Sequence, residues 1–151
     1  MVRGMQTTLA FVLAIASHIH DARGFQKPIP VPVAEAVVVV SNDSPLWENQ
    51  ERETAATLAY WAFRESSWLT NVIGDSGKSC GLGQTPCRET PHDAVGQLRI
   101  MVKHMKRSML LDPEHPFRVY ASGDIHSVAG ARISDARSQA VRELLVLVEE
   151  N

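Results

Sequence analysis

Glu65 is the residue of this chain whose type and position best suit acid–base chemistry. It lies three residues after Ala62 and four after Trp61, so the three side chains share one side of a predicted helix. A carboxyl group on an apolar helix face is partly desolvated, and desolvation favours its neutral, protonated form. A protonated carboxyl near neutral pH is what the cleavage of a glycosidic bond requires. The helix alone also allows the alternative that Glu65 points into solvent.

A glycine-rich segment follows Glu65. Residues 74–81 contain three glycines, which permit positive φ and a close approach of the backbone. We therefore expect a loop or a tight hairpin here, and we expect any sheet of the protein in this segment. The segment leads into Gly81-Leu82-Gly83-Gln84, whose glutamine is separated from Glu65 by 19 positions.

Three motifs, in this order, resemble the lysozyme-like superfamily, specifically its lytic transglycosylase and goose-type lysozyme branch. Residues 65–68 (Glu-Ser-Ser-Trp) match a Glu-Ser-x-aromatic motif in which a catalytic glutamate ends a helix. Residues 81–84 match Gly-Leu-Met-Gln, with Gly83 at the methionine position. Residues 120–123 (Tyr-Ala-Ser-Gly) are similar to a Tyr-Asn-x-Gly segment, with alanine in place of asparagine. The resemblance covers roughly residues 50–150.

The resemblance implies a role for each matching polar residue. Glu65 would act as the general acid and then as the general base of the reaction. Gln84 would form a hydrogen bond with the sugar or its N-acetyl group, and Tyr120 would orient Glu65 through its hydroxyl. Each of the last two residues has an alternative, because Gln84 could hold the loop backbone and Tyr120 could be a core residue.

Ser66, Trp68 and Gly81 complete the substrate-binding residues that the resemblance implies. Ser66 has the alternative of holding the loop without touching substrate. Trp68 either stacks on a sugar ring or packs under the loop, and both interpretations stay open. Gly81 begins the Gly-Leu-x-Gln motif.

The substrate that the resemblance implies is peptidoglycan, cleaved at the β-1,4 bond between N-acetylmuramic acid and N-acetylglucosamine. Chitin-type polymers are the lesser alternative, because they also carry N-acetylated β-1,4-linked sugars. A lytic transglycosylase uses the muramic 6-hydroxyl and works with one glutamate, whereas a hydrolase needs an activated water or a second carboxylate. The motifs favour the transglycosylase.

Asp75 is the candidate second carboxylate for the alternative, a hydrolytic lysozyme. It lies ten residues after Glu65 in the glycine-rich segment, a placement similar to that of the acidic partner in phage-type lysozymes. Its alternative is a turn residue, since aspartate is favoured in turns for its local hydrogen bonds to the backbone.

Two further alternatives involve no catalysis. One is a cell-wall-binding or phage structural module that keeps a lysozyme-like fold. The other is a helical interaction protein without a sugar site. A groove lined by Glu65, Gln84 and Tyr120 would argue against the second alternative, and a divergence of these side chains would argue against an enzyme.

Composition limits other classes of function. The chain has 151 residues, of which 44% are hydrophobic and 21% charged, and this fits one soluble globular domain. The net charge of −2 argues against a nucleic-acid binder driven by bulk charge. His18 and His20 have no further ligand at metal-binding spacing, and acid–base catalysis needs no cofactor, so we expect neither metal nor cofactor. We expect a monomer whose partner is the peptidoglycan strand.

The N-terminal segment has two interpretations. An apolar run over residues 9–16 follows Arg3, which fits a short secretory leader, although the run is too short to span a bilayer in the mature protein. A secreted or periplasmic protein would follow, whereas a chain without a leader fits a phage-associated enzyme. The other interpretation is a first core helix whose buried face is Leu9, Val12, Leu13 and Ala16.

The pattern along the chain predicts a mainly helical, α+β lysozyme-like fold, with helices around one buried helix and the glycine-rich hairpin beside a cleft. Residues 1–30 would form the N-terminal segment with its proline-rich connector, and residues 31–151 the catalytic domain. Residues 33–40 fit a strand or a helix, and we expect a helix. Further helices are expected over residues 49–66, 93–111, 117–120 and 134–150.

Side-chain patterns assign the core faces of the two later helices. The helix over 93–111 would bury Val95, Leu98, Met101, Val102, Met105 and Met109. Ser134 is the expected N-cap of the last helix. That helix would turn inward Ala136, Ala140, Val141, Leu144, Leu145 and Val148.

Cys80 and Cys87 are the two cysteines of the chain. They could close a small disulfide loop in an oxidising compartment. We expect instead two free, half-buried thiols.

Overall fold

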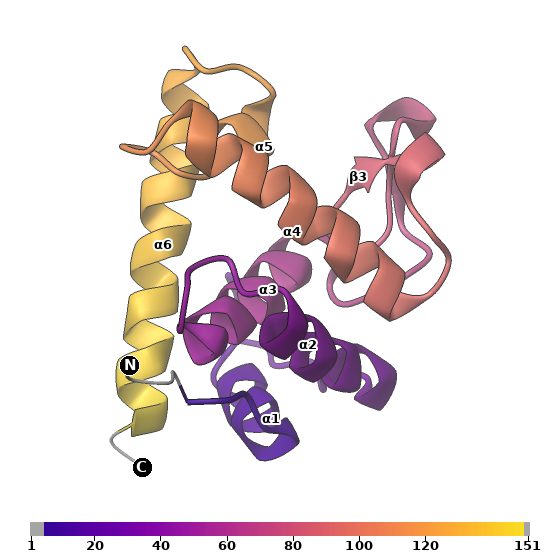
Figure 1. The fold of residues 1–151 in the computed structure, drawn as a ribbon. Coiled ribbons are helices and arrows are strands. Elements are labelled where there is room, and N and C mark those ends of the chain that lie inside the picture. The colour runs from indigo at the N-terminus through magenta and orange to yellow at the C-terminus, as the bar shows by residue number, and fades with distance from the viewer. Residues whose placement is uncertain (1–4, 150–151) are drawn as a thin grey trace.

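The computed structural model describes residues 5–149 of the chain (Figure 1). Its described part contains six α-helices and one three-stranded antiparallel sheet, which confirms a mainly helical chain with its sheet in the glycine-rich segment. The helices are α1 Leu9–Ser17, α2 Val31–Asp43, α3 Glu51–Ser66, α4 Ala94–Leu111, α5 Arg118–Ser122 and α6 Val128–Glu149. The strands are β1 Ile73–Gly74, β2 Ser79–Cys80 and β3 Thr85–Pro86, with short 3₁₀ turns η1 (Asp75–Gly77) and η2 (Cys87–Glu89) between and after them.

Helix α3 is the buried central helix that the sequence predicts. It packs against α1, α2 and α6, and apolar or small residues occupy nearly its whole circumference from Thr54 to Phe63. A helix that is apolar all round is buried, and alanines at 55, 56, 59 and 62 let the neighbouring helices approach closely. The helix ends where Ser67 adopts a left-handed conformation (φ 53°). This end places Glu65 at the edge of the core.

Helix α1 packs into the same hydrophobic core as α2 and α3. Its buried residues are Phe11, Val12, Ile15 and Ala16, so the prediction that Leu9 and Leu13 face inward is wrong. Phe11 and Ile15 take the inward positions, and the Arg52 guanidinium of α3 covers the Phe11 ring at 4.8 Å. Arg3, the basic residue that precedes this segment, lies outside the described residues. No helix within residues 5–149 has the length and apolar content to cross a membrane.

Residues 33–40 form a helix, as expected. Pro30 precedes the first residue of α2, and Pro32 lies in its first turn. Backbone N–H groups in the first turn have no partner within the helix, so proline is tolerated there. Val33, Val37 and Val40 recur at helical spacing and are buried. This spacing explains how a valine-rich run becomes a core helix.

Helix α4 has the predicted core stripe, with Leu98, Met101, Val102 and Met105 buried and Val95 and Met109 packed at its edge. In Figure 1, α6 and the small sheet lie on opposite sides of the view, and α4 runs between α5 and the sheet.

Helix α6 begins at Val128, six residues before the predicted start. Ser134 is not an N-cap: it is buried within the helix, and its hydroxyl accepts a hydrogen bond from the Phe117 N–H at 3.0 Å. Ser127 acts in its place, since its hydroxyl accepts from the Gly130 N–H at 2.9 Å. Ala136 is exposed on this helix, against the prediction.

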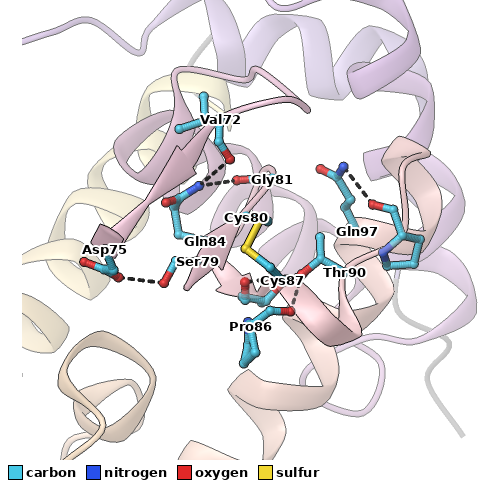
Figure 2. The surroundings of a disulfide bond; sticks show 12 residues. Val72, Asp75, Ser79, Cys80, Gly81, Gln84, Pro86, Cys87, Thr90 and Gln97 are labelled. Carbon is cyan, nitrogen blue, oxygen red and sulfur yellow. Dashed lines mark hydrogen bonds between the residues drawn. A yellow bond between two sulfur atoms is a disulfide. The ribbon is translucent and has the colours of Figure 1, made fainter. Parts of the chain in front are cut away.

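The sheet is a short meander in the order β1-β2-β3. Cys80 pairs with Ile73 on one side and with Thr85 on the other. This register brings the Cα atoms of Cys80 and Cys87 to 4.9 Å, and the two cysteines form a disulfide (Figure 2). The expectation of free thiols is therefore wrong. A spacing of seven residues allows either free thiols or a disulfide, and the pairing of the strands brings the two cysteines together.

Replacing both cysteines by serine is expected to lower the free energy of unfolding by about 2–3 kcal/mol, because the bond closes a loop of about eight residues in the unfolded chain. Urea unfolding of the oxidised protein and the double variant measures the difference. The double variant should be insensitive to dithiothreitol, whereas the native protein should lose the same stability on reduction. Equal stability of oxidised native protein and variant would contradict this prediction.

Candidate active site

Glu65 forms an ion pair with Arg137 of α6. The Glu65 side chain is 24% exposed, and its Oε1 accepts a hydrogen bond from Arg137 Nη1 at 2.5 Å. The guanidinium also lies over the Trp61 ring, with Cζ 4.3 Å from the centroid. The helix pattern predicts an apolar environment for this carboxyl group, but its closest partner is the charged Arg137 side chain. A general acid must carry a proton, and Arg137 contacts only Oε1 of this carboxyl group, which leaves Oε2 as the oxygen that would hold the proton.

Tyr120 lies beside this pair but its hydroxyl has another partner. It donates to the Gly83 carbonyl at 2.6 Å, so the predicted contact of the hydroxyl with Glu65 is not present. The Tyr120 ring packs edge-on against Trp61, with centroids 5.4 Å apart. Burial raises the pKa of Tyr120 far above its usual value, and the nearby negative charge of Glu65 raises it further. The phenol consequently stays a neutral donor that links α5 to the glycine-rich loop.

Gln84 holds the loop backbone, which is the alternative given for it above. Its Nε2 donates to the carbonyls of Val72 at 3.2 Å and Gly81 at 3.0 Å (Figure 2). The residue itself has a positive φ of 49°. A side chain with these bonds positions the turn, and its amide nitrogen is not free to bind a sugar in this arrangement.

Ser66 and Trp68 are internal residues. Ser66 is 5% exposed, and its hydroxyl donates to the Ala62 carbonyl at 2.8 Å. Trp68 is 1% exposed, its indole N–H donates to the Ala59 carbonyl at 2.8 Å, and its ring packs against Phe63. Neither ring face of Trp68 is open to a sugar. The interpretation that Trp68 packs under the loop is the one that fits this burial.

Gln97 of α4, which no sequence motif indicates, links three parts of the loop. It is 2% exposed, its Oε1 accepts from the Leu82 N–H at 2.8 Å, and its Nε2 donates to the carbonyls of Thr70 and Pro91 at 3.0 Å. A Cβ atom on Gly81 would lie 2.5 Å from this Oε1, and Gly81 has φ +74°. Gly81 therefore serves the packing of the loop.

A groove of about 360 Å³ lies between the sheet with η2 on one side and α4 with α5 on the other. Gln84 and Tyr120 both line it, but Glu65 does not. Two of the three predicted site residues therefore share this groove, whereas Glu65 lies outside its lining, close enough to Tyr120 for its charge to act on the phenol. Polar residues at the groove also include Arg88, Glu89, His104 and Arg107.

Asp75 takes the turn role that was its alternative. It has φ 49°, and its Oδ2 accepts from the Ser79 hydroxyl at 2.6 Å (Figure 2). It is exposed and lines a neighbouring open hollow of about 700 Å³ with Lys78 and Arg88. This contact holds the hairpin from β1 to β2.

Glu89 and His104 connect the two walls of the groove. His104 Nε2 and Glu89 Oε2 are 2.6 Å apart, which joins η2 to α4. The hydrogen bond from His104 lowers the pKa of Glu89, and the charges of Lys103 and Arg88 lower it further. No sequence motif indicates this pair, because its members come from separate elements.

The lowered pKa of Glu89 gives a test of this contact. The contribution of the ionised Glu89 to stability is present above the ordinary glutamate pKa and is lost as the pH falls through the lowered pKa of the folded protein. In His104→Asn we expect Glu89 to titrate closer to its ordinary value, and NMR of its carboxyl carbon measures the midpoint. Arg88→Gln should shift the midpoint less, because the hydrogen bond is the larger cause. An unchanged midpoint in His104→Asn would show that the pair does not form in solution.

Residues 5–149 contain no group of three or more histidine, cysteine, aspartate or glutamate side chains placed to hold a metal ion. Comparison with protein-family models, with curated proteins and with solved structures found no match to this chain.

Proposed function

We propose that this protein cleaves peptidoglycan at the β-1,4 bond between N-acetylmuramic acid and N-acetylglucosamine, as a lytic transglycosylase with a lysozyme-like fold. The observation that carries the proposal is the position of Glu65. Its partly exposed carboxylate ends a buried helix and lies beside Tyr120, which borders a groove together with Gln84. The order of the three motifs along the chain supports the same activity.

The two oxygens of Glu65 suit different tasks in this mechanism. Oε1 is held by Arg137, which fixes the orientation of the carboxyl group. Oε2 has no hydrogen-bond partner within residues 5–149, so we assign it the proton. Glu65 would donate this proton to the glycosidic oxygen as the bond to the anomeric carbon breaks. The muramic 6-hydroxyl would then attack that carbon and return its proton to Glu65, which closes a 1,6-anhydro ring.

A non-catalytic wall-binding or phage structural module is the second candidate. The observation that favours it is the engagement of the site within the protein, since Glu65 is ion-paired and the Tyr120 hydroxyl and the Gln84 amide nitrogen bond the loop backbone. A hydrolytic lysozyme has less support, because Asp75 is bonded to Ser79 in an exposed turn. In each case we propose a monomer that acts at the bacterial wall, as a secreted, periplasmic or phage-associated protein.

Digestion of purified peptidoglycan, with products identified by mass spectrometry, tests the proposal. A lytic transglycosylase should release muropeptides that are one water lighter than reducing-end products. Reducing-end products would instead establish a lysozyme, and Asp75→Asn would then be expected to abolish their release. The absence of products from several wall types would favour the non-catalytic module.

A further inference from the structure

Two arginines face the groove from opposite walls. Arg88 belongs to η2 and Arg107 to α4, and both line the groove of about 360 Å³. Neither side chain has a hydrogen bond or an ion pair with another residue in the described part of the chain. A guanidinium offers a planar, paired set of donors that matches a carboxylate. Two such groups beside one groove suit a ligand with carboxylate groups along its length.

The local charge of the groove differs from that of the whole chain. The chain carries a net charge of −2, but the groove is lined by two arginines and one acidic residue, Glu89. The carboxylate of Glu89 already has a hydrogen bond with His104, at 2.6 Å. Arg88 also borders the neighbouring hollow, where Lys78 adds a further positive charge. Anionic ligands are therefore favoured at this groove.

Two hydrogen bonds and a disulfide hold the walls of the groove in place. The Glu89–His104 bond joins η2 to α4, and the bond from the Tyr120 hydroxyl to the Gly83 carbonyl joins α5 to the loop. The disulfide from Cys80 to Cys87 holds the base of η2 to β2. Arg88 and Arg107 therefore project from positions that the fold holds at a set separation, which favours selective binding.

We propose that Arg88 and Arg107 recognise the carboxylates carried by N-acetylmuramic acid, so that the groove selects peptidoglycan over neutral N-acetylated glycans such as chitin. The inference depends on the proposed function, because it names the feature by which that substrate is distinguished. The carboxylate comes from the lactyl group where the sugar carries no peptide, or from the peptide stem where the lactyl carboxyl is joined to it as an amide. Both sources have the chemistry that a guanidinium binds.

Binding without cleavage tests this inference, with Glu65→Gln as the background. Affinities are measured at one salt concentration for three glycans of equal length: chitooligosaccharide, strands stripped of peptide, and strands with peptide stems. We expect the carboxylated strands to bind at least about tenfold more tightly than chitooligosaccharide, and Arg88→Gln or Arg107→Gln to remove most of that preference. Lys106→Gln, which removes an exposed charge one position from Arg107 and outside the groove, should leave it unchanged.

The outcomes separate the two proposals. If stripped strands bind more tightly than chitooligosaccharide, the arginines recognise the lactyl carboxylate. If only stem-bearing strands bind more tightly, the arginines recognise the carboxylates of the peptide. Equal affinity for chitooligosaccharide, or an equal effect of Lys106→Gln, would overturn the inference even if the native protein cleaves peptidoglycan. A charge preference without any cleavage by the native protein would leave the groove assignment in place and overturn the transglycosylase.

Discussion

Glu65→Gln is expected to reduce the release of products from peptidoglycan by at least about a hundredfold, because an amide can neither donate nor accept the proton that the reaction transfers. The substitution keeps the shape of the side chain. The amide oxygen can still accept from Arg137 Nη1, so the stacking of the guanidinium over Trp61 should be retained. Initial rates at equal protein concentration, with circular dichroism and thermal unfolding as checks on the fold, measure the effect.

Asp75→Asn is the matched control for this prediction. It makes the same change from carboxylate to amide, and asparagine can still accept from the Ser79 hydroxyl in the turn. A transglycosylase should keep at least about half of its rate in this variant, because one glutamate suffices for its chemistry. If Glu65→Gln kept the native rate, catalysis would not use Glu65, and the ion pair with Arg137 would have a structural role only.

Local sequence patterns predicted the elements in which buried apolar residues, or turn glycines, recur at a regular spacing. The stripe from Leu98 to Met105 identified α4, and glycines at 74, 77 and 81 identified the hairpin. The start of α6 was missed because Ser134 has the residue type of a cap, while its hydroxyl instead serves the Phe117 N–H across the helix packing. A buried serine and a capping serine look alike until the neighbouring element is in place.

The motifs located the residues of the candidate site, but they did not predict the partners of those residues. Arg137 lies 72 positions after Glu65, and no periodic pattern relates the two. Gly83 leaves no room for a side chain, because a Cβ atom there would lie 2.6 Å from the Tyr120 hydroxyl and 2.9 Å from the Met101 side chain. The spacing of motifs thus carries information on the chain path, whereas hydrogen-bond partners depend on the packing of distant segments.

Gln97→Leu is expected to lower the free energy of unfolding by about 3 kcal/mol or more. Leucine has a similar size, but it would leave the buried Leu82 N–H and the part-buried carbonyls of Thr70 and Pro91 without their partner. Each unsatisfied buried group costs about 1–3 kcal/mol, less where water enters the loop. Urea unfolding gives the total loss, and hydrogen exchange at the Leu82 amide shows whether the loop opens first.

Gln139→Leu is the control for the change of residue type, since Gln139 is exposed on α6 and its hydrogen bonds are all with nearby residues of that helix. Its effect should stay within about 0.5 kcal/mol. A Gln97→Leu protein of native stability, with a protected Leu82 amide, would show that the loop does not need this residue. A large loss with rapid exchange at Leu82 would instead mean that one side chain of α4 fixes the loop. Because that loop carries Gly83, Gln84 and one wall of the groove, binding of peptidoglycan strands should then fall in the same variant.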